Sequence, residues 1–141
     1  MDQLFVIKLS SIWWYFVSSL CGSLLVRFVI SYFGMREAEK GSRTLFWEIF
    51  KGNGYKEDHL KPPIAADYGL GFWLGLLELL AYPILLKSNH AAYIGAWLAF
   101  KTVNRWGYAP GYKRGTYNRY LLANSLIICI SYLMAYFFVD S

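Results

Sequence analysis

Two ionisable residues, Glu78 and Lys101, stand out because each interrupts an otherwise apolar stretch of the sequence. Placing such a charge at the centre of a membrane helix costs about 2.5–3.5 kcal/mol for Asp, Lys or Arg, so intramembrane charges usually pair or serve an ion pathway. Each of the two residues lies eleven positions from a polar turn at Asn89–His90. In an antiparallel helical hairpin, equal sequence distance means equal depth, here about 16 Å from the turn. We therefore predict an intramembrane ion pair between Glu78 and Lys101.

The predicted pair has two interpretations. In the structural one, each charge neutralises the other and fixes the register of the hairpin. In the functional one, the pair lines a cavity and exchanges a proton, or binds an ion or a head group. The structural interpretation is favoured, because no relay of further carboxylates accompanies the pair.

Three further polar residues are candidates for a supporting network. Asn104 and Asn124 lie toward the same predicted membrane face, so their amides are placed to hydrogen-bond across helices, a contact worth about 0.6 kcal/mol on average. Ser131 follows Asn124 by seven residues and therefore shares its helix face. Asn104 taken alone is better explained as an ordinary interfacial asparagine.

Small residues recur at helical spacing beside both charges. Gly71 and Gly75 share one helix face with Glu78, and Gly95 and Ala99 give the following helix a small face of its own. Small side chains let two membrane helices approach closely. We expect these four residues to mark helix-packing surfaces.

No residue pattern in the sequence predicts catalysis, metal binding or a cofactor. The two cysteines, Cys21 and Cys129, each lie in an apolar run, and only His59 and His90 accompany them. This set is too small and too dispersed for a metal-ligand cluster, and the sequence contains no phosphate-binding loop. His59 follows two acidic residues and has the side chain of a general base, but a loop histidine beside acids is usually just solvated.

The composition of the chain indicates which elements hold these residues. Of its 141 residues, 57% are hydrophobic and 16% are charged, whereas a soluble domain carries about 25% charged residues. A helix needs about 20 apolar residues to cross the hydrocarbon layer, and four runs approach that length. We predict one all-α membrane domain over residues 1–141, a polytopic bundle of four transmembrane helices at about 9–33, 68–86, 88–106 and 120–139. Because Lys101 interrupts the third run, a chain with three spans and a re-entrant segment at 88–106 is the alternative.

Basic residues are concentrated in two of the predicted loops. Nine of the fourteen Lys and Arg residues lie in loops 34–67 and 107–119, and a tenth, Arg105, lies just before the second of these loops. Cytoplasmic loops collect such residues. Both termini are therefore predicted outside, in a bacterial inner membrane or another membrane that faces a cytoplasm. Anionic lipid head groups attract basic residues near the membrane surface. Arg27 lies inside the first predicted span, and its position is explained if its long side chain extends to the head groups. The residues expected to contact head groups are Arg27, Arg105, Lys113, Arg114 and Arg119.

The first loop contains a short helical pattern. Leu45, Phe46, Ile49 and Phe50 recur at helical spacing among polar residues. This pattern predicts an amphipathic helix that lies on the inner leaflet or packs against the cytoplasmic end of the bundle.

These features favour a non-enzymatic structural or accessory membrane protein that acts through helix–helix and lipid contacts. The alternatives are a small ion, proton or solute translocator that uses the Glu78–Lys101 pair, and a lipid-modifying membrane enzyme. The expected partners are anionic membrane lipids, with a second copy of the chain or another membrane protein. Nucleic acid is not expected as a partner, because the tyrosine-rich basic loop at 107–119 adjoins two predicted spans, where lipid binding is the simpler explanation.

Overall fold

The chain is all-α in the computed structural model, which describes residues 11–37, 43–51, 70–108 and 114–139. The helices that form in these ranges follow the apolar runs of the sequence closely. They are α1 (Ile12–Glu37), α2 (Arg43–Phe50), α3 (Leu70–Lys87), α4 (Ala91–Tyr108) and α5 (Arg114–Phe138).

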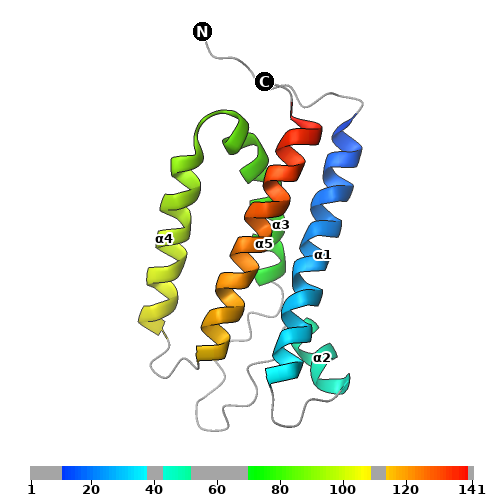
Figure 1. The fold of residues 1–141 in the computed structure, drawn as a ribbon, viewed down its shortest axis with the longest axis vertical. Helices are drawn as coiled ribbons and strands as arrows, with labels where there is room; N and C mark the ends of the chain where they lie inside the picture. Colours follow the sequence, from blue (N-terminus) through cyan, green and yellow to red (C-terminus); the bar gives the residue numbers. More distant parts are fainter. Residues whose placement is uncertain (1–10, 38–42, 52–69, 109–113, 140–141) are drawn as a thin grey trace.

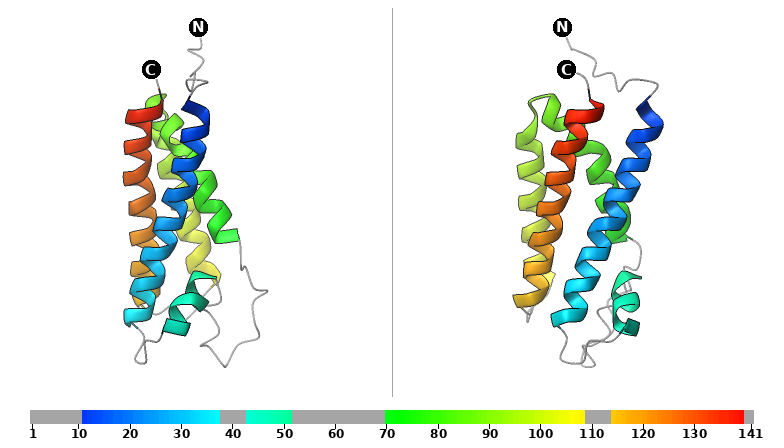
Figure 2. Two further views of the ribbon diagram at one scale, coloured as in Figure 1. Left: turned by 90° about the vertical axis from the view of Figure 1, so that its right-hand side faces the viewer. Right: turned by 45° about the vertical axis from the view of Figure 1, so that its right-hand side comes forward.

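Helices α1, α3 and α5 form the core of the molecule, and each of them packs against the other two. Helix α4 stands to one side of this core, on the side of α5 away from α1, and packs mainly against α3 (Figure 1). The turn between α3 and α4 lies at the same end as the start of α1 and the end of α5, and α2 lies at the opposite end (Figure 2). The four long helices therefore run alternately up and down.

Small side chains allow α1 to lie close to its neighbours. A Cβ atom added at Gly22 would be 3.2 Å from side-chain atoms of both Ile130 and Leu79, which is tighter than most real contacts. Ser19 and Ser131 are fully buried, and each hydroxyl donates to a carbonyl one turn earlier in its own helix. These buried polar groups are satisfied within their own helices, so the core can be compact without leaving them unpaired.

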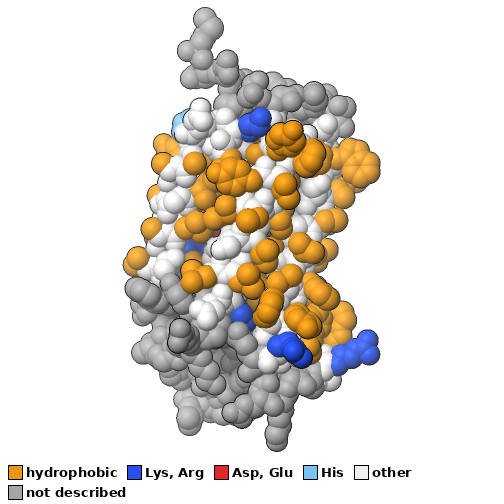
Figure 3. All heavy atoms as spheres, viewed as in Figure 1, with side chains coloured by type: hydrophobic (Ala, Val, Ile, Leu, Met, Phe, Trp, Pro, Cys, Tyr) orange, Lys and Arg blue, Asp and Glu red, His pale blue; other side chains and the backbone are white. Residues whose placement is uncertain are grey.

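The outer surfaces of the helices are apolar over most of their length, as Figure 3 shows for one face. Two helical segments, Ile12–Arg36 and Asn118–Phe138, are long and apolar enough to cross a membrane, with mean hydropathies of 1.7 and 1.9. Only 28% of the apolar window in each is buried, whereas the core helix of a soluble protein would be mostly buried. Two helices could thus cross a membrane.

The turn between α3 and α4 is compact and well defined. The His90 amide donates to the Leu85 carbonyl at 2.9 Å, and Asn89 adopts a positive φ of 58°. This is the helix-ending pattern in which a left-handed residue lets the chain satisfy the last carbonyls of the helix, and asparagine tolerates that conformation better than most residues. The turn lies where the sequence predicts it and sets the register of α3 against α4.

Helix α2 packs against the end of α1, as the second of its two sequence interpretations expects. Phe46 is buried, and its ring meets that of Phe28 edge-on at a centroid distance of 5.2 Å. Trp47 and Glu48 are exposed. The short helix therefore closes one end of the bundle through an aromatic contact.

Candidate functional site

The side chains of Glu78 and Lys101 are in direct contact. Lys101 Nζ lies 2.6 Å from Glu78 Oε1, which joins α3 to α4 by an ion pair. The Glu78 side chain is 5% exposed and that of Lys101 is 19% exposed. The two groups meet eleven residues before and after the turn, at the depth that the hairpin geometry predicts.

Two neutral side chains complete a group that we call the polar cluster: Glu78, Trp97, Lys101 and Asn124. Trp97 donates from Nε1 to Glu78 Oε1 at 2.7 Å. Lys101 donates to Asn124 Oδ1 at 3.0 Å, so the lysine also connects α4 to α5. The cluster thus connects α3, α4 and α5. Its hydrogen bonds involve charged partners, and such bonds are stronger than neutral ones.

Local helix geometry brings the members of the polar cluster together. Trp97 and Lys101 are one turn apart and share the face of α4 that is turned to α3. On α5, the Asn124 amide donates to the Tyr120 carbonyl at 2.8 Å, which orients its oxygen toward the lysine. Lys101 Nζ also lies 5.9 Å from the centroid of the Tyr120 ring, a distance at which an ammonium is attracted to an aromatic face.

The hydrogen bonds leave one side of the glutamate unused. Glu78 Oε1 accepts two hydrogen bonds, whereas Glu78 Oε2 is buried without a partner. The hydroxyl of Tyr82, one turn further along α3, is also buried without a partner. The cluster is neutral overall, because its single negative and single positive charges are paired.

Of the other predicted polar residues, Ser131 lies outside the cluster. Ser131 is buried on α5, but its hydroxyl donates to the Ile127 carbonyl at 2.7 Å and not to the pair. Asn104 and Arg105 lie in α4 and Arg114 begins α5, but their side chains, like all of Lys113, are outside the described residues. Their expected roles stay predictions.

The predicted small-residue positions differ in their surroundings. An added Cβ at Gly75 would touch Ser23 and Ile127 at ordinary contact distances, which places Gly75 in the core interface. Gly71 and Gly95 have open space around them, and Ala99 is exposed. None of these three positions is packed against another of the described residues.

Two of the predicted head-group arginines lie against other parts of the chain. Arg27 donates from Nε to the Phe50 carbonyl at the end of α2, and its guanidinium lies 5.7 Å from the ring centroids of Phe50 and Phe72. A cation at a helix C-terminus is stabilised by the helix dipole. The Arg119 guanidinium lies so close to Gly34 that a side chain there would collide with it. Arg27 thus links α1 to the end of α2, the Arg119 side chain lies against α1 at Gly34, and lipid contact by either arginine stays a prediction.

Sequence reasoning missed two contacts that position the site. The role of Trp97 was detectable, because the residue is one turn before Lys101 and carries the only hydrogen-bond donor that an indole offers. Tyr15 donates to the Leu80 carbonyl at 2.5 Å and so joins α1 to α3 two residues after Glu78. No local pattern signals that contact, because its partners are 65 residues apart.

The described residues hold no group of three or more His, Cys, Asp or Glu side chains that could bind a metal ion. No protein-family model, no curated protein and no solved structure matches the chain.

Proposed function

We propose that the chain is a four-span integral membrane protein with a non-enzymatic, structural or accessory role. Helices α1 and α5 are long and apolar enough to cross a membrane, and α3 and α4 run alongside them as a hairpin (Figure 1). The basic residues Arg36 and Arg119 belong to the end of the bundle that also carries α2. By the charge bias of membrane proteins this end faces the cytoplasm, with both chain termini on the other side.

The observation that carries the proposed role is the uneven attachment of α4. Among its described side chains, Ile94 alone is counted in the buried core. The polar cluster links α4 to α3 and α5, and the hydroxyls of Thr102 and Tyr120, 3.5 Å apart, add a second polar contact to α5. A helix that is fixed by specific polar bonds but not enclosed by the bundle is suited to bind another helix on its remaining surface.

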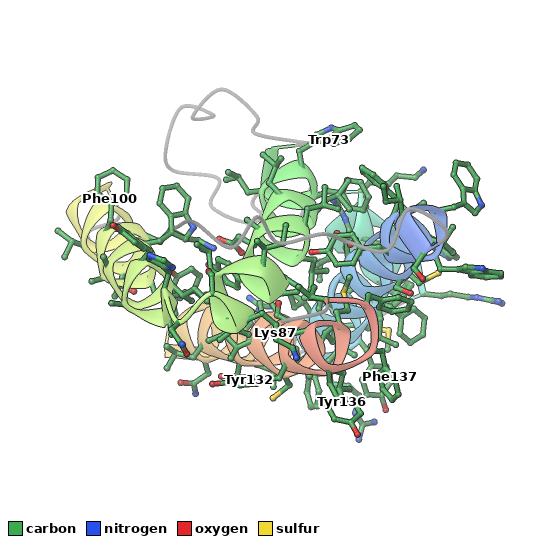
Figure 4. The ribbon with its side chains drawn as sticks, turned by 90° about the horizontal axis from the view of Figure 1, so that it is seen from above. Trp73, Lys87, Phe100, Tyr132, Tyr136 and Phe137 are labelled. Atoms are coloured by element: carbon green, nitrogen blue, oxygen red, sulfur yellow. The ribbon has the colours of Figure 1, made fainter. Side chains whose placement is uncertain are left out.

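The remaining surface of α4 is apolar and carries large side chains. Tyr93, Phe100 and Val103 are exposed, and Phe100 points away from the other helices (Figure 4). Lipid can cover such a surface, but the open space around Gly95 also allows a partner backbone to approach closely. A second copy of the chain or another membrane protein is the expected partner.

Photo-crosslinking in the native membrane tests this role. A photoreactive amino acid replaces Val103 on α4, and the same amino acid at Leu133 on α5 is the control, because the two side chains are 68% and 61% exposed. A protein adduct of discrete mass from position 103 alone is expected. Lipid adducts alone from both positions would refute a partner-binding role for α4.

A translocator is the second candidate function, and the unpartnered Glu78 Oε2 favours it. A buried carboxylate oxygen with a free lone pair can accept a proton or take part in binding an ion. Proteoliposomes with wild-type protein would then carry a proton or ion flux that Glu78→Gln abolishes. An unchanged flux in the variant would exclude this function.

A further inference from the structure

Helix α2 carries two exposed basic residues and an exposed tryptophan along one side of its surface. Arg43, Trp47 and Lys51 follow one another at intervals of four residues, and side chains at that spacing share a helix face. The Lys51 amide donates to the Trp47 carbonyl at 3.0 Å, so the helical turn extends to the lysine. All three side chains are exposed, Trp47 at 50%. We call these three residues the α2 stripe.

Aromatic contacts fix the α2 stripe relative to the bundle. The Trp47 ring meets the rings of Phe46 and Phe50 edge-on, at centroid distances of 5.4 and 5.6 Å. Phe46 is buried and contacts Phe28 of α1, and the Phe50 carbonyl accepts a hydrogen bond from Arg27. The stripe therefore belongs to a helix that is docked on α1.

Exposed aromatic residues of α1 indicate the level of α2 relative to a membrane. Trp13 and Trp14 are exposed near the start of α1, and Tyr32 and Phe33 are exposed near its end. Aromatic residues collect at both membrane interfaces. From Trp14 to Phe33 the helix rises about 29 Å, close to the hydrocarbon thickness of about 30 Å. Helix α2 lies beside the last turns of α1 and beyond the start of α3 (Figure 2), at the level of one interface.

The exposed charges at this level are mainly positive. Arg36 is exposed at the end of α1, about 5 Å beyond Phe33 along the helix, and joins the two basic residues of the α2 stripe. Glu48 is the one acidic residue of α2. None of the three basic residues forms an ion pair with another of the described residues. Their charges therefore complement an anionic surface.

We propose that the α2 stripe binds the head groups of anionic phospholipids in the leaflet on the α2 side of the bundle. Arg43 and Lys51 bind phosphate oxygens of separate lipids, because about 12 Å of helix separates them. Trp47 lies between them at the boundary with the acyl chains, where an indole keeps its apolar ring in hydrocarbon and its N–H among polar groups. Each basic residue near the surface favours anionic lipid by about fivefold. This surface rests on the proposed four-span arrangement.

Lipid retention tests the charge preference of the α2 stripe. Native mass spectrometry counts the lipids that stay bound to protein released from nanodiscs of equal parts phosphatidylglycerol and phosphatidylcholine. Wild-type protein should retain an excess of phosphatidylglycerol, and Arg43→Gln and Lys51→Gln should each lower that excess by up to about fivefold. Lys87→Gln removes a cation at the opposite end of the bundle and should leave the excess unchanged. Equal retention of both lipids by wild type, or equal losses in all three variants, would overturn the proposal.

The depth of Trp47 tests the position of the α2 stripe. The difference in fluorescence quenching between wild type and Trp47→Phe isolates this one tryptophan in nanodiscs of brominated lipid. Bromine near the glycerol end of the acyl chain should quench Trp47 more strongly than bromine at the chain terminus. Equal quenching, or none from either lipid, would overturn the interfacial position.

Alkaline extraction of membranes separates failure of the α2 stripe from failure of the four-span arrangement. Wild-type protein should stay in the membrane pellet. Protein that stays there but retains both lipids equally would refute the α2 stripe alone. Wild-type protein released by alkali would refute the four-span proposal and the α2 stripe together.

Discussion

Removing the two charges of the Glu78–Lys101 pair one at a time should destabilise the protein by unequal amounts. Lys101→Met strands a carboxylate whose side chain is 5% exposed and which keeps Trp97 as its remaining donor. A buried charge without its counter-ion costs about 3–5 kcal/mol of unfolding free energy. In Glu78→Met, Lys101 keeps its hydrogen bond to Asn124, and its side chain is 19% exposed to solvent. The expected loss of unfolding free energy is therefore that of one charged hydrogen bond, about 1.5–3 kcal/mol.

The double variant distinguishes direct contact from independent effects. Replacing both members of a buried ion pair by apolar side chains is often nearly neutral. The double methionine variant should therefore lose less stability than Lys101→Met alone. The expected coupling energy is at least about 2 kcal/mol, a change of about thirtyfold in the unfolding equilibrium.

Equilibrium unfolding in mixed micelles measures these differences. The six tryptophans of the chain report the transition by fluorescence as a denaturing detergent is titrated. Lys87→Met is the control, since this lysine ends α3 far from the pair and should change stability by less than about 1 kcal/mol. Losses that add to within about 0.5 kcal/mol would show that the two residues do not interact and would refute the structural argument for the cluster.

Three other substitutions test the contacts that hold the bundle. Tyr15→Phe removes the hydrogen bond to the Leu80 carbonyl and should lower the unfolding free energy by about 1 kcal/mol in the same titration; no change would mean that the bond adds nothing. Gly22→Val forces α1 away from α3 and α5, so a loss of about 1–3 kcal/mol is expected, and a stable variant would contradict the close approach. Arg27→Met releases the Phe50 carbonyl, and hydrogen exchange should become faster in α2 but not in α1; equal exchange in wild type and variant would show that Arg27 does not anchor α2.

Much of the helical layout was predictable from the sequence, because long apolar runs leave few alternatives to helix. The contact between Glu78 and Lys101 was predictable for a stronger reason. A short turn at Asn89 fixes the register of an antiparallel hairpin, so sequence distance alone gives relative depth. That argument does not extend beyond the hairpin, and four membrane crossings stay a proposal, since two helices meet the length and hydropathy of a span among the described residues.

The remaining contacts of the site join segments that are distant in the sequence. The partner of Asn124 is 23 residues away on α4, and its choice depends on how α5 rotates about its axis. The environment of Arg27 depends on the folding of α2 back onto α1. Neither the rotation of α5 nor the folding of α2 onto α1 leaves a periodic pattern in the sequence. The sequence therefore predicts a lipid contact for Arg27, whereas in the structure Arg27 binds the last turn of α2.

Helix α4 is attached to the rest of the bundle at two places, one near its N-terminal end and one near its middle. The turn at Asn89 is one support, and the polar cluster at Lys101 is the other, about 15 Å along the helix. From Lys101 the helix continues for about 10 Å to its end at Tyr108. If α4 tilts as a rigid helix about the turn, its last described turn moves farther than Lys101 does, in proportion to its greater distance from Asn89.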